Sequence, residues 1–254
     1  MRGRAWIAGL LLSVVTVAAP ARADIWPAKP IHIVVTFAPG GAADIWARIL
    51  AEHLSTAFKQ SVVVENRGGG GGIVAATQVA RADPDGTTIL MGGLAPQILA
   101  PAIAGNAGFD ALRDFTHIAY IGGPPIVLVV PPSSELRSLD DVIAAAKADK
   151  FSGYASSGVG TLGHLVVEYV AKRHNLKLTH IPYNTAAFAD IIGGRVPMGS
   201  FTWGAALGQL QGGTLRALAV TTATRRPEQP KVPTFKELGY DLVASTWFSF
   251  SGPK

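Results

Sequence analysis

The stretch IHIVVTF at residues 31–37, followed directly by APGGAAD at residues 38–44, decides the fold. The first part is a nearly continuous run of β-branched and aromatic residues, which is typical of a strand buried on both faces of a sheet. A proline and two glycines then end the strand. Apolar side chains between residues 45 and 58 share one face of a helix. The pattern therefore predicts a strand, a glycine turn and a helix.

The same unit recurs along the chain. A strand is predicted at residues 61–65, a loop with five consecutive glycines at 66–72, and a helix at 73–82. Further strands are predicted at residues 87–91, 118–121, 126–130, 152–154, 178–181, 198–201, 215–220 and 245–250, and further helices at 139–148, 161–174, 187–192 and 205–210. This alternation indicates an α/β architecture with mostly parallel sheets.

Two stretches rich in glycine and proline, residues 122–125 and 221–233, indicate a division into lobes. The prediction assigns residues 24–122 and 222–254 to lobe one and residues 123–221 to lobe two. Two α/β lobes crossed twice by the chain form an interlobe cleft that can close on a ligand by hinge motion. A single larger sheet is the alternative that the pattern leaves open.

The N-terminus resembles a secretory signal. Arg2 and Arg4 precede an apolar stretch at residues 5–19, and residues 21–23 form an A-x-A cleavage site. We therefore expect residues 1–23 to be a signal peptide cleaved after Ala23; an uncleaved anchor or a core helix is the alternative. Cleavage removes three arginines and no acid, so the formal net charge falls from +5 to +2, with 19 basic residues against 17 acidic ones.

Composition narrows the classes of function. The chain has no cysteine, which excludes a thiol nucleophile, thiolate metal ligands, disulfides and a lipid-modified cysteine. An exported protein of this kind is expected in the periplasm, with full secretion as the alternative. The small net charge, without any block of like charges, predicts no nucleic-acid partner. The six histidines show no metal-ligand spacing and no G-x-S-x-G motif is present, so we expect no catalytic residue, no metal and no cofactor.

The loop after the first strand is the first candidate binding segment. It consists of Ala38, Pro39, Gly40, Gly41, Ala42, Ala43 and Asp44. Glycine allows the backbone to approach a ligand closely, and the first amides of the following helix are free donors at the positive end of its dipole. Such a loop suits an anion. The alternative is a plain connecting turn in which Asp44 favours the start of the helix.

A second candidate lies in the middle of the chain, again between a strand and a helix. Its members are Ser156, Ser157, Gly158, Gly160 and Thr161, with His164 on the following helix. Gly158, Gly160 and Gly163 match G-x-G-x-x-G, so a nucleotide-binding α/β enzyme is a competing prediction. No acidic residue stands about 20 residues further on, where a ribose would need it. The serines and the threonine add hydroxyl donors at a helix start, which favours a small carboxylate; for His164 a packed or surface position is the alternative.

A third candidate comprises Tyr183, Asn184 and Thr185, which could complete a site or simply cap a helix. The run of five glycines lacks the Gly-Lys-Ser/Thr ending of a phosphate-binding loop. We interpret that run as a flexible or close-packed loop.

Several motifs together resemble a known family. They are PAKPI at residues 27–31, FAPGGAADIWAR at 37–48, VENR at 64–67 with the glycine loop, PDG at 84–86, YASSG at 154–158 and LRALAV at 215–220. The chain resembles the extracytoplasmic substrate-binding proteins of tripartite tricarboxylate transporters, the Bug-type receptors. The resemblance implies a two-lobed, periplasmic-binding-protein-like fold that grips a carboxylate through backbone amides, hydroxyls and bridging water.

The resemblance also implies which residues bind. On one lobe these are Ala38 to Ala43, with Asp44 as a selectivity or capping residue; on the other they are Ser156 to Thr161 and Tyr183 to Ala186. We expect a monomeric, non-enzymatic receptor for a small organic acid that serves membrane transport subunits or a sensor domain. A binding-dead relative that acts only as a protein partner is a further alternative. The family continues past the last predicted strand, so lobe one is expected to be incomplete at its C-terminus.

Overall fold

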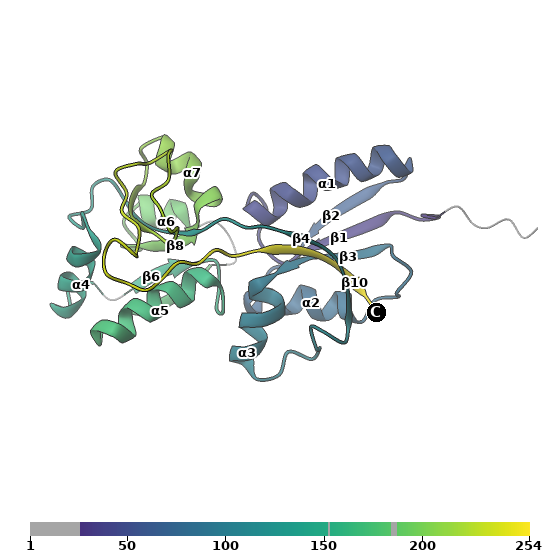
Figure 1. The fold of residues 1–254 in the computed structure, drawn as a ribbon, viewed down its shortest axis with the longest axis horizontal. Coiled ribbons are helices and arrows are strands. Elements are labelled where there is room, and N and C mark those ends of the chain that lie inside the picture. Colours follow the sequence, from purple (N-terminus) through teal and green to yellow (C-terminus); the bar gives the residue numbers. More distant parts are fainter. Residues whose placement is uncertain (1–25, 152, 184–186) are drawn as a thin grey trace, which may run out of the picture.

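A computed structural model describes residues 26–151, 153–183 and 187–254 (Figure 1). Two separate five-stranded sheets form two lobes, so the prediction of a two-lobed α/β fold is confirmed and the single larger sheet is wrong. Sheet one has the order β2-β1-β3-β10-β4. Its strands are β1 (Ile31–Val35), β2 (Val62–Asn66), β3 (Thr88–Gly93), β4 (Phe115–Ile121) and β10 (Phe248–Pro253).

Sheet two repeats the arrangement with the order β7-β6-β8-β5-β9. Its strands are β5 (Ile126–Val130), β6 (Gly153–Ser156), β7 (Thr179–Pro182), β8 (Gly199–Thr202) and β9 (Arg216–Val220). In each sheet the first three strands pair in parallel, and the fourth is antiparallel to both of its neighbours. Four strands of five thus run in the same direction, as the alternating pattern predicts.

Helices cover both faces of each sheet. In lobe one, α1 (Ala42–Phe58) packs on the face that carries Ile33 and Val35, and α2 (Ile73–Ala80) packs on the opposite face with Val34. In lobe two, α4 (Leu139–Lys147) and α5 (Leu162–His174) cover one face, while α6 (Phe188–Ile192) and α7 (Trp203–Gln211) cover the other. The β-branched runs are therefore buried on both sides, because successive residues of a strand point to opposite faces.

The predicted strands and helices appear within a few residues of their expected bounds, but one helical segment was not predicted. A π-helix, η2 (Ala95–Leu99), continues into α3 (Ala100–Ala104), and a short 3-10 turn, η1 (Gly70–Gly72), precedes α2. Pro96 and Pro101 lie in this segment, each in the first turn of its helix. At Pro96, near the start of the segment, proline is tolerated because the amide that it lacks has no helical partner in any case.

The chain crosses between the lobes twice, along segments that run side by side (Figure 1). Pro125 and Ser245 form a β-bridge, and the amide of Thr246 donates to the carbonyl of Pro124 at 3.1 Å. A Cβ on Gly123 would lie 2.2 Å from the carbonyl oxygen of Thr246, so only glycine permits this approach. The paired segments form the connection about which the lobes can move.

The returning segment packs differently from the predicted division, which assigned residues 222–254 to lobe one. Phe235 and Tyr240 are buried in the core of lobe two with Leu128 and Leu218, and Val232 joins its other core cluster. Apolar side chains at residues 232–242 fill the surface beside β5 and β9 before the chain returns to sheet one. The exact lobe boundaries stay a prediction.

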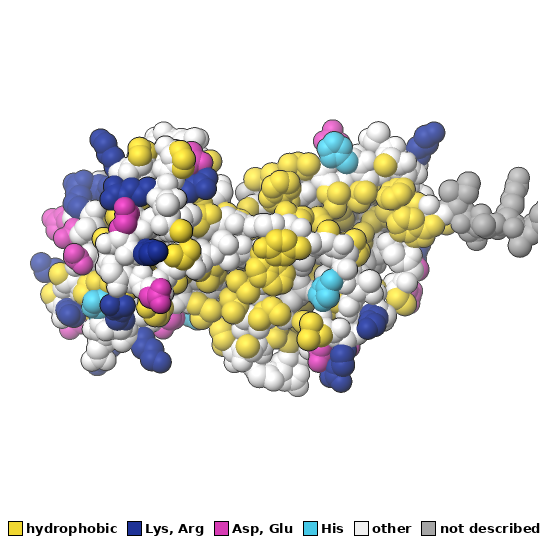
Figure 2. All heavy atoms as spheres, in the orientation of Figure 1, with side chains coloured by type: hydrophobic (Ala, Val, Ile, Leu, Met, Phe, Trp, Pro, Cys, Tyr) yellow, Lys and Arg dark blue, Asp and Glu magenta, His cyan; other side chains and the backbone are white. Residues whose placement is uncertain are grey.

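The surface of the two lobes differs in character. Figure 2 shows hydrophobic side chains across one face of lobe one, and charged side chains mainly over lobe two. β4 is an edge strand whose Ile118 and Tyr120 are 59% and 72% exposed. Within the described residues, no helix combines the length and apolar character that crossing a membrane requires.

Replacement of Phe235 by alanine is expected to lower the free energy of unfolding by about 3–5 kcal/mol, because the side chain is fully buried in the core of lobe two. Urea unfolding followed by circular dichroism measures the change. Val243→Ala is the matched control in the same returning segment, since Val243 is 54% exposed and should change stability by less than about 0.5 kcal/mol. Equal effects of the two substitutions would contradict the packing described above.

Candidate ligand-binding site

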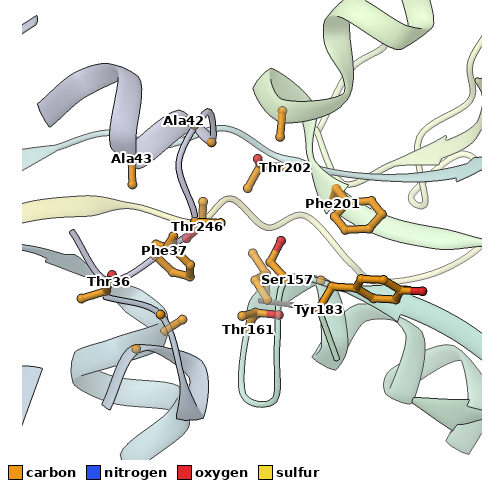
Figure 3. A pocket seen from close by; sticks show the side chains of 18 of the residues that line it. Thr36, Phe37, Ala42, Ala43, Ser157, Thr161, Tyr183, Phe201, Thr202 and Thr246 are labelled. Carbon is orange, nitrogen blue, oxygen red and sulfur yellow. The ribbon is translucent and has the colours of Figure 1, made fainter. Parts of the chain in front are cut away.

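A cavity of about 270 Å³ lies between the lobes and takes its walls from both (Figure 3). Lobe one and the returning segment contribute Thr36, Phe37, Ala38, Pro39, Gly40, Gly41, Ala42, Ala43, Gly68, Gly69, Gly71, Gly72, Ala95, Thr246 and Phe248. Lobe two contributes Ile126, Ser157, Thr161, Leu162, Gly163, Tyr183, Phe188, Ser200, Phe201, Thr202, Ala205 and Gln209. Among these described residues none carries a charged side chain.

Three helices begin at the cavity. The first helical hydrogen bond of α1 runs from the amide of Ile45 to Gly41, and no side chain caps the helix, so the amides of Ala42 and Ala43 have no partner within it. The starts of α5 and α7 lie in the opposite wall, where Leu162, Gly163 and Ala205 line the cavity. Each helix start carries a partial positive charge of roughly half an elementary charge. Three such ends at one uncharged cavity make it attractive to an anion.

Asp44 supports the first loop from behind and does not line the cavity. Its buried carboxylate accepts hydrogen bonds from the Gly40 amide at 2.9 Å, the Arg48 guanidinium at 3.0 Å and the Asn66 amide group at 2.9 Å. Burial alone would raise the pKa of this carboxyl, but the three hydrogen bonds outweigh it and hold the pKa below its ordinary value. Asp44 thus fixes the turn that presents Ala42 and Ala43.

Ser156 supports the second loop in the same way. Its hydroxyl lies 2.7 Å from the Nε2 of His180 and accepts a hydrogen bond from the Gly158 amide at 3.1 Å. The hydroxyl of Thr161 caps α5 and donates to the carbonyl of Gly158 at 2.8 Å. The loop that carries Ser157 is therefore held in place by the hydroxyls of Ser156 and Thr161.

Histidines lie beneath this loop in a stacked cluster. The rings of His164 and His180 are 4.1 Å apart, and Tyr154 stacks on the other side of His180 at 5.1 Å. The Nδ1 of His164 accepts a hydrogen bond from the Gly160 amide at 3.2 Å. Burial, together with the neighbouring His164, lowers the pKa of His180 to about 4, and burial lowers the pKa of His164 as well. The lowered pKa values favour neutral rings near pH 7, and His164 accepts a hydrogen bond through its Nδ1.

Glycines let the two lobes touch at one edge of the cavity. A Cβ on Gly71 would lie 2.2 Å from the carbonyl oxygen of Val159, and a Cβ on Gly160 would lie 2.7 Å from the Cα of Ala100. Both glycines also have positive φ angles, of 67° and 76°. Gly160 of the G-x-G-x-x-G pattern thus serves a close contact between lobes, and Gly158 and Gly160 do not line the cavity. This removes the main support for the nucleotide-binding alternative.

The structure brings together part of the predicted site. Nine predicted residues line the cavity: Ala38, Pro39, Gly40, Gly41, Ala42, Ala43, Ser157, Thr161 and Tyr183. Asp44, Ser156, Gly158, Gly160 and His164 lie behind the lining. Asn184, Thr185 and Ala186 fall outside the described residues. The hydroxyl of Tyr183 points away from the cavity (Figure 3) and donates to Asp190 at 2.7 Å.

Other lining residues were missed. The glycine run, interpreted above as a flexible or close-packed loop, contributes four lining residues. Thr202 and Ala205 belong to a third strand-to-helix turn, and this pattern itself could have identified them. Ser200 is fully buried on β8, and no described residue is a hydrogen-bond partner of its hydroxyl. Thr246 and Phe248 belong to the segment that returns from lobe two to sheet one, and no local sequence pattern identifies them as lining residues.

Comparison with known proteins identifies the family. Residues 46–254 match the family model described as "Tripartite tricarboxylate transporter family receptor". The chain belongs to this family. It is 36% identical over 253 residues to Protein BugT of Bordetella pertussis, an alignment that covers 98% of this chain and 78% of BugT. The resemblance inferred from the sequence is thereby confirmed.

Solved structures of relatives share the fold. The R. palustris protein Rpa4515 with adipate is 32% identical, with a TM-score of 0.80 over 90% of this chain and 78% of its own. The periplasmic binding protein BugD is 30% identical, with a TM-score of 0.80 over the same shares of the two chains. Members of this receptor family are periplasmic solute-binding proteins, and the two lobes with a cavity between them agree with that role.

Two buried serines on neighbouring strands provide a matched comparison. Ser156 and Ser200 are register partners of β6 and β8, and each is fully buried. Ser156→Ala is expected to lower the free energy of unfolding by about 1–3 kcal/mol, because the Gly158 amide loses its acceptor. Ser200→Ala should leave it unchanged or raise it, since no described partner is lost. Urea unfolding without ligand tests the pair; a larger loss for Ser200→Ala would contradict this description.

The stacked histidines predict a pH dependence of stability. The unfolded chain protonates His180 near pH 6.5, whereas the folded protein resists protonation until about pH 4, so the unfolded state binds more protons between these values. The free energy of unfolding should therefore fall as the pH is lowered from 7.5 to 5.5. His180→Gln should show a smaller fall, measured by urea unfolding at both pH values. His53→Gln, at an exposed position, is the control and should match the parent protein; identical falls in all three proteins would refute the assignment.

Proposed function

We propose that the protein is a periplasmic receptor that binds a small organic acid through its carboxylate, in the cavity between the lobes. The observation that carries this proposal is the convergence of three helix starts on a cavity whose described lining has no charged side chain. A carboxylate accepts hydrogen bonds from main-chain amides and is stabilised by the positive ends of the helices. The relative solved with adipate supports the same class of ligand.

The proposed donors come from both lobes. On lobe one they are the amides of Ala42 and Ala43, presented by the loop that Asp44 holds. On lobe two, the hydroxyls of Ser157 and Thr202 lie at the cavity and can bind the ligand (Figure 3). Thr246 adds a hydroxyl from the crossing segment. A ligand that contacts both lobes favours the closed arrangement, because only that arrangement offers all of its partners.

The size of the cavity limits the ligand. A volume of about 270 Å³ lies just below the usual range of ligand sites in proteins, which is about 300–1,000 Å³. A small acid fits this space, whereas a dinucleotide does not. The proposal includes no catalytic residue, metal or cofactor.

The family of the receptor supports a proposal for its location and partners. We propose that residues 1–23 are removed on export and that the mature protein acts as a monomer in the periplasm. It would deliver its ligand to membrane transport subunits, as the description of the family suggests, or present it to a sensor domain. The lobes would close about the paired segments at residues 122–125 and 245–247.

A ligand screen tests the proposal. Purified protein is freed of bound molecules by partial unfolding and refolding, and its melting temperature is measured with a broad panel of mono-, di- and tricarboxylates. A binding acid should raise the melting temperature in proportion to the logarithm of its concentration above Kd. Native mass spectrometry of freshly purified protein should detect a bound acid of the same class. Binding of nucleotides alone, or of no acid in the panel, would overturn the proposal.

Ala42→Asp is expected to weaken carboxylate binding by at least tenfold while leaving the fold intact. Ala42 is the first residue of α1, where an acidic side chain stabilises a helix, and it faces the start of α7, since a Cβ on Gly204 would lie 3.9 Å from the Cβ of Ala42. The new carboxylate would occupy the positive region that the ligand needs. Isothermal titration measures the affinity.

Ala42→Asn is the matched control for that substitution, because it has the same shape without the charge. Its affinity should fall less than that of Ala42→Asp, and the melting temperatures of the two ligand-free variants show whether both remain folded. Equal affinity in Ala42→Asp and the parent protein would place the anion elsewhere.

A further inference from the structure

We propose that the cavity selects organic acids with an apolar body and rejects acids of the same length that carry several hydroxyl groups. This inference rests on the function proposed above and narrows its class of ligand. It concerns the part of the ligand beyond the carboxylate, which the helix starts do not contact.

Aromatic side chains form opposite walls of the cavity. Phe37 from lobe one and Phe201 from lobe two lie on opposite sides of it (Figure 3). Each is supported by a second ring that also lines the cavity: Phe248 lies 6.5 Å from Phe37, and Phe188 lies 5.0 Å from Phe201, both in edge-to-face geometry. These pairs fix the rings in place. A hydrocarbon chain or ring between them would exchange water for apolar contact, which is favourable.

Eight of the described lining residues have polar side chains, and three of these are already committed to the protein. The hydroxyl of Thr36 donates to the carbonyl of Met91, that of Thr161 to Gly158 and that of Tyr183 to Asp190. The hydroxyls of Ser157, Thr202 and Thr246 are the partners proposed above for the carboxylate. Among the described lining residues, the side chains of Ser200 and Gln209 are then left for hydroxyl groups along the body of a ligand, which is too few for an acid with four of them.

An unpaired hydroxyl in such a place weakens binding, because the ligand gives up hydrogen bonds to water and gains none in return. One unpaired group reduces affinity by about tenfold, and an apolar pocket discriminates against an added hydroxyl by at most about a hundredfold. An acid with four hydroxyls should therefore bind at least tenfold more weakly than its apolar counterpart.

Two pairs of acids of equal carbon number test this selectivity by isothermal titration of the intact protein freed of bound molecules. Adipate and galactarate are six-carbon dicarboxylates that differ by four hydroxyls. Cyclohexanecarboxylate and quinate are six-membered-ring monocarboxylates that differ in the same way. We expect the apolar member of at least one pair to bind at least tenfold tighter than its partner, and neither pair to show the reverse order.

Equal or reversed affinity within a pair that binds would overturn the inference while leaving the receptor function intact. Failure of all four acids to bind would also overturn it. The broad carboxylate panel described above then reports separately on the proposed function, since a different acid that binds there keeps that function and loses only the selectivity.

A substitution in the wall tests the physical cause. Phe37→Gln replaces a partly exposed ring by a hydrogen-bonding side chain, and it should reduce the preference for the apolar acid by at least fivefold. Phe58→Gln is the matched control, because Phe58 is 39% exposed at the end of α1 and does not line the cavity; its preference should equal that of the parent. An unchanged preference in a folded Phe37→Gln protein would contradict the proposed role of the wall.

Discussion

The arrangement of the molecule depends on one constraint: an anion is to be bound without any charged side chain at the cavity. Main-chain amides meet this requirement where helices begin, because the first amides of a helix have no partner within it. α1, α5 and α7 follow β1, β6 and β8 respectively, each at the carboxyl end of its strand. β6 and β8 are parallel neighbours, so α5 and α7 begin at the same edge of sheet two. The parallel strand order is thus what gathers the donors.

The polar side chains that hold the two binding loops in place lie behind the lining of the cavity. Asp44 accepts a hydrogen bond from the Gly40 amide and forms an ion pair with Arg48. The positive charge of Arg48 offsets the negative charge of Asp44 near the cavity. The neutral ring of His180 holds Ser156, which in turn holds the amide of Gly158. These contacts fix the two loops at rest, so that binding does not have to order them. Preorganisation of this kind reduces the entropic cost of association.

The sequence predicts what is local and leaves out what depends on long-range contact. Strand and helix periodicity identify the elements, and glycine turns before helices identify Ala38 to Ala43 and Ser157. The same turns do not reveal that the side chains of Asp44 and Ser156 lie behind the cavity lining. Their positions depend on Asn66 and His180, which are 22 and 24 residues away in the sequence. Thr246 and Phe248 could not be predicted, because they reach the cavity only after the chain has crossed between the lobes twice. The role of Gly71 likewise requires knowledge of Val159 on the other lobe.

Binding without ion pairs also suits a protein that has to release its ligand. An ion pair buried in a closed cleft loses most of its hydration, and breaking it leaves a charge that must be hydrated again. Amides at helix starts present only partial charges, and water can replace the ligand on them when the lobes separate. The close contacts at Gly71 and Gly160 involve backbone and small side chains alone, so no side-chain interlock resists separation there. The uncharged lining and the glycine contacts therefore serve the same end: a cleft that closes around an acid and can open again at low cost.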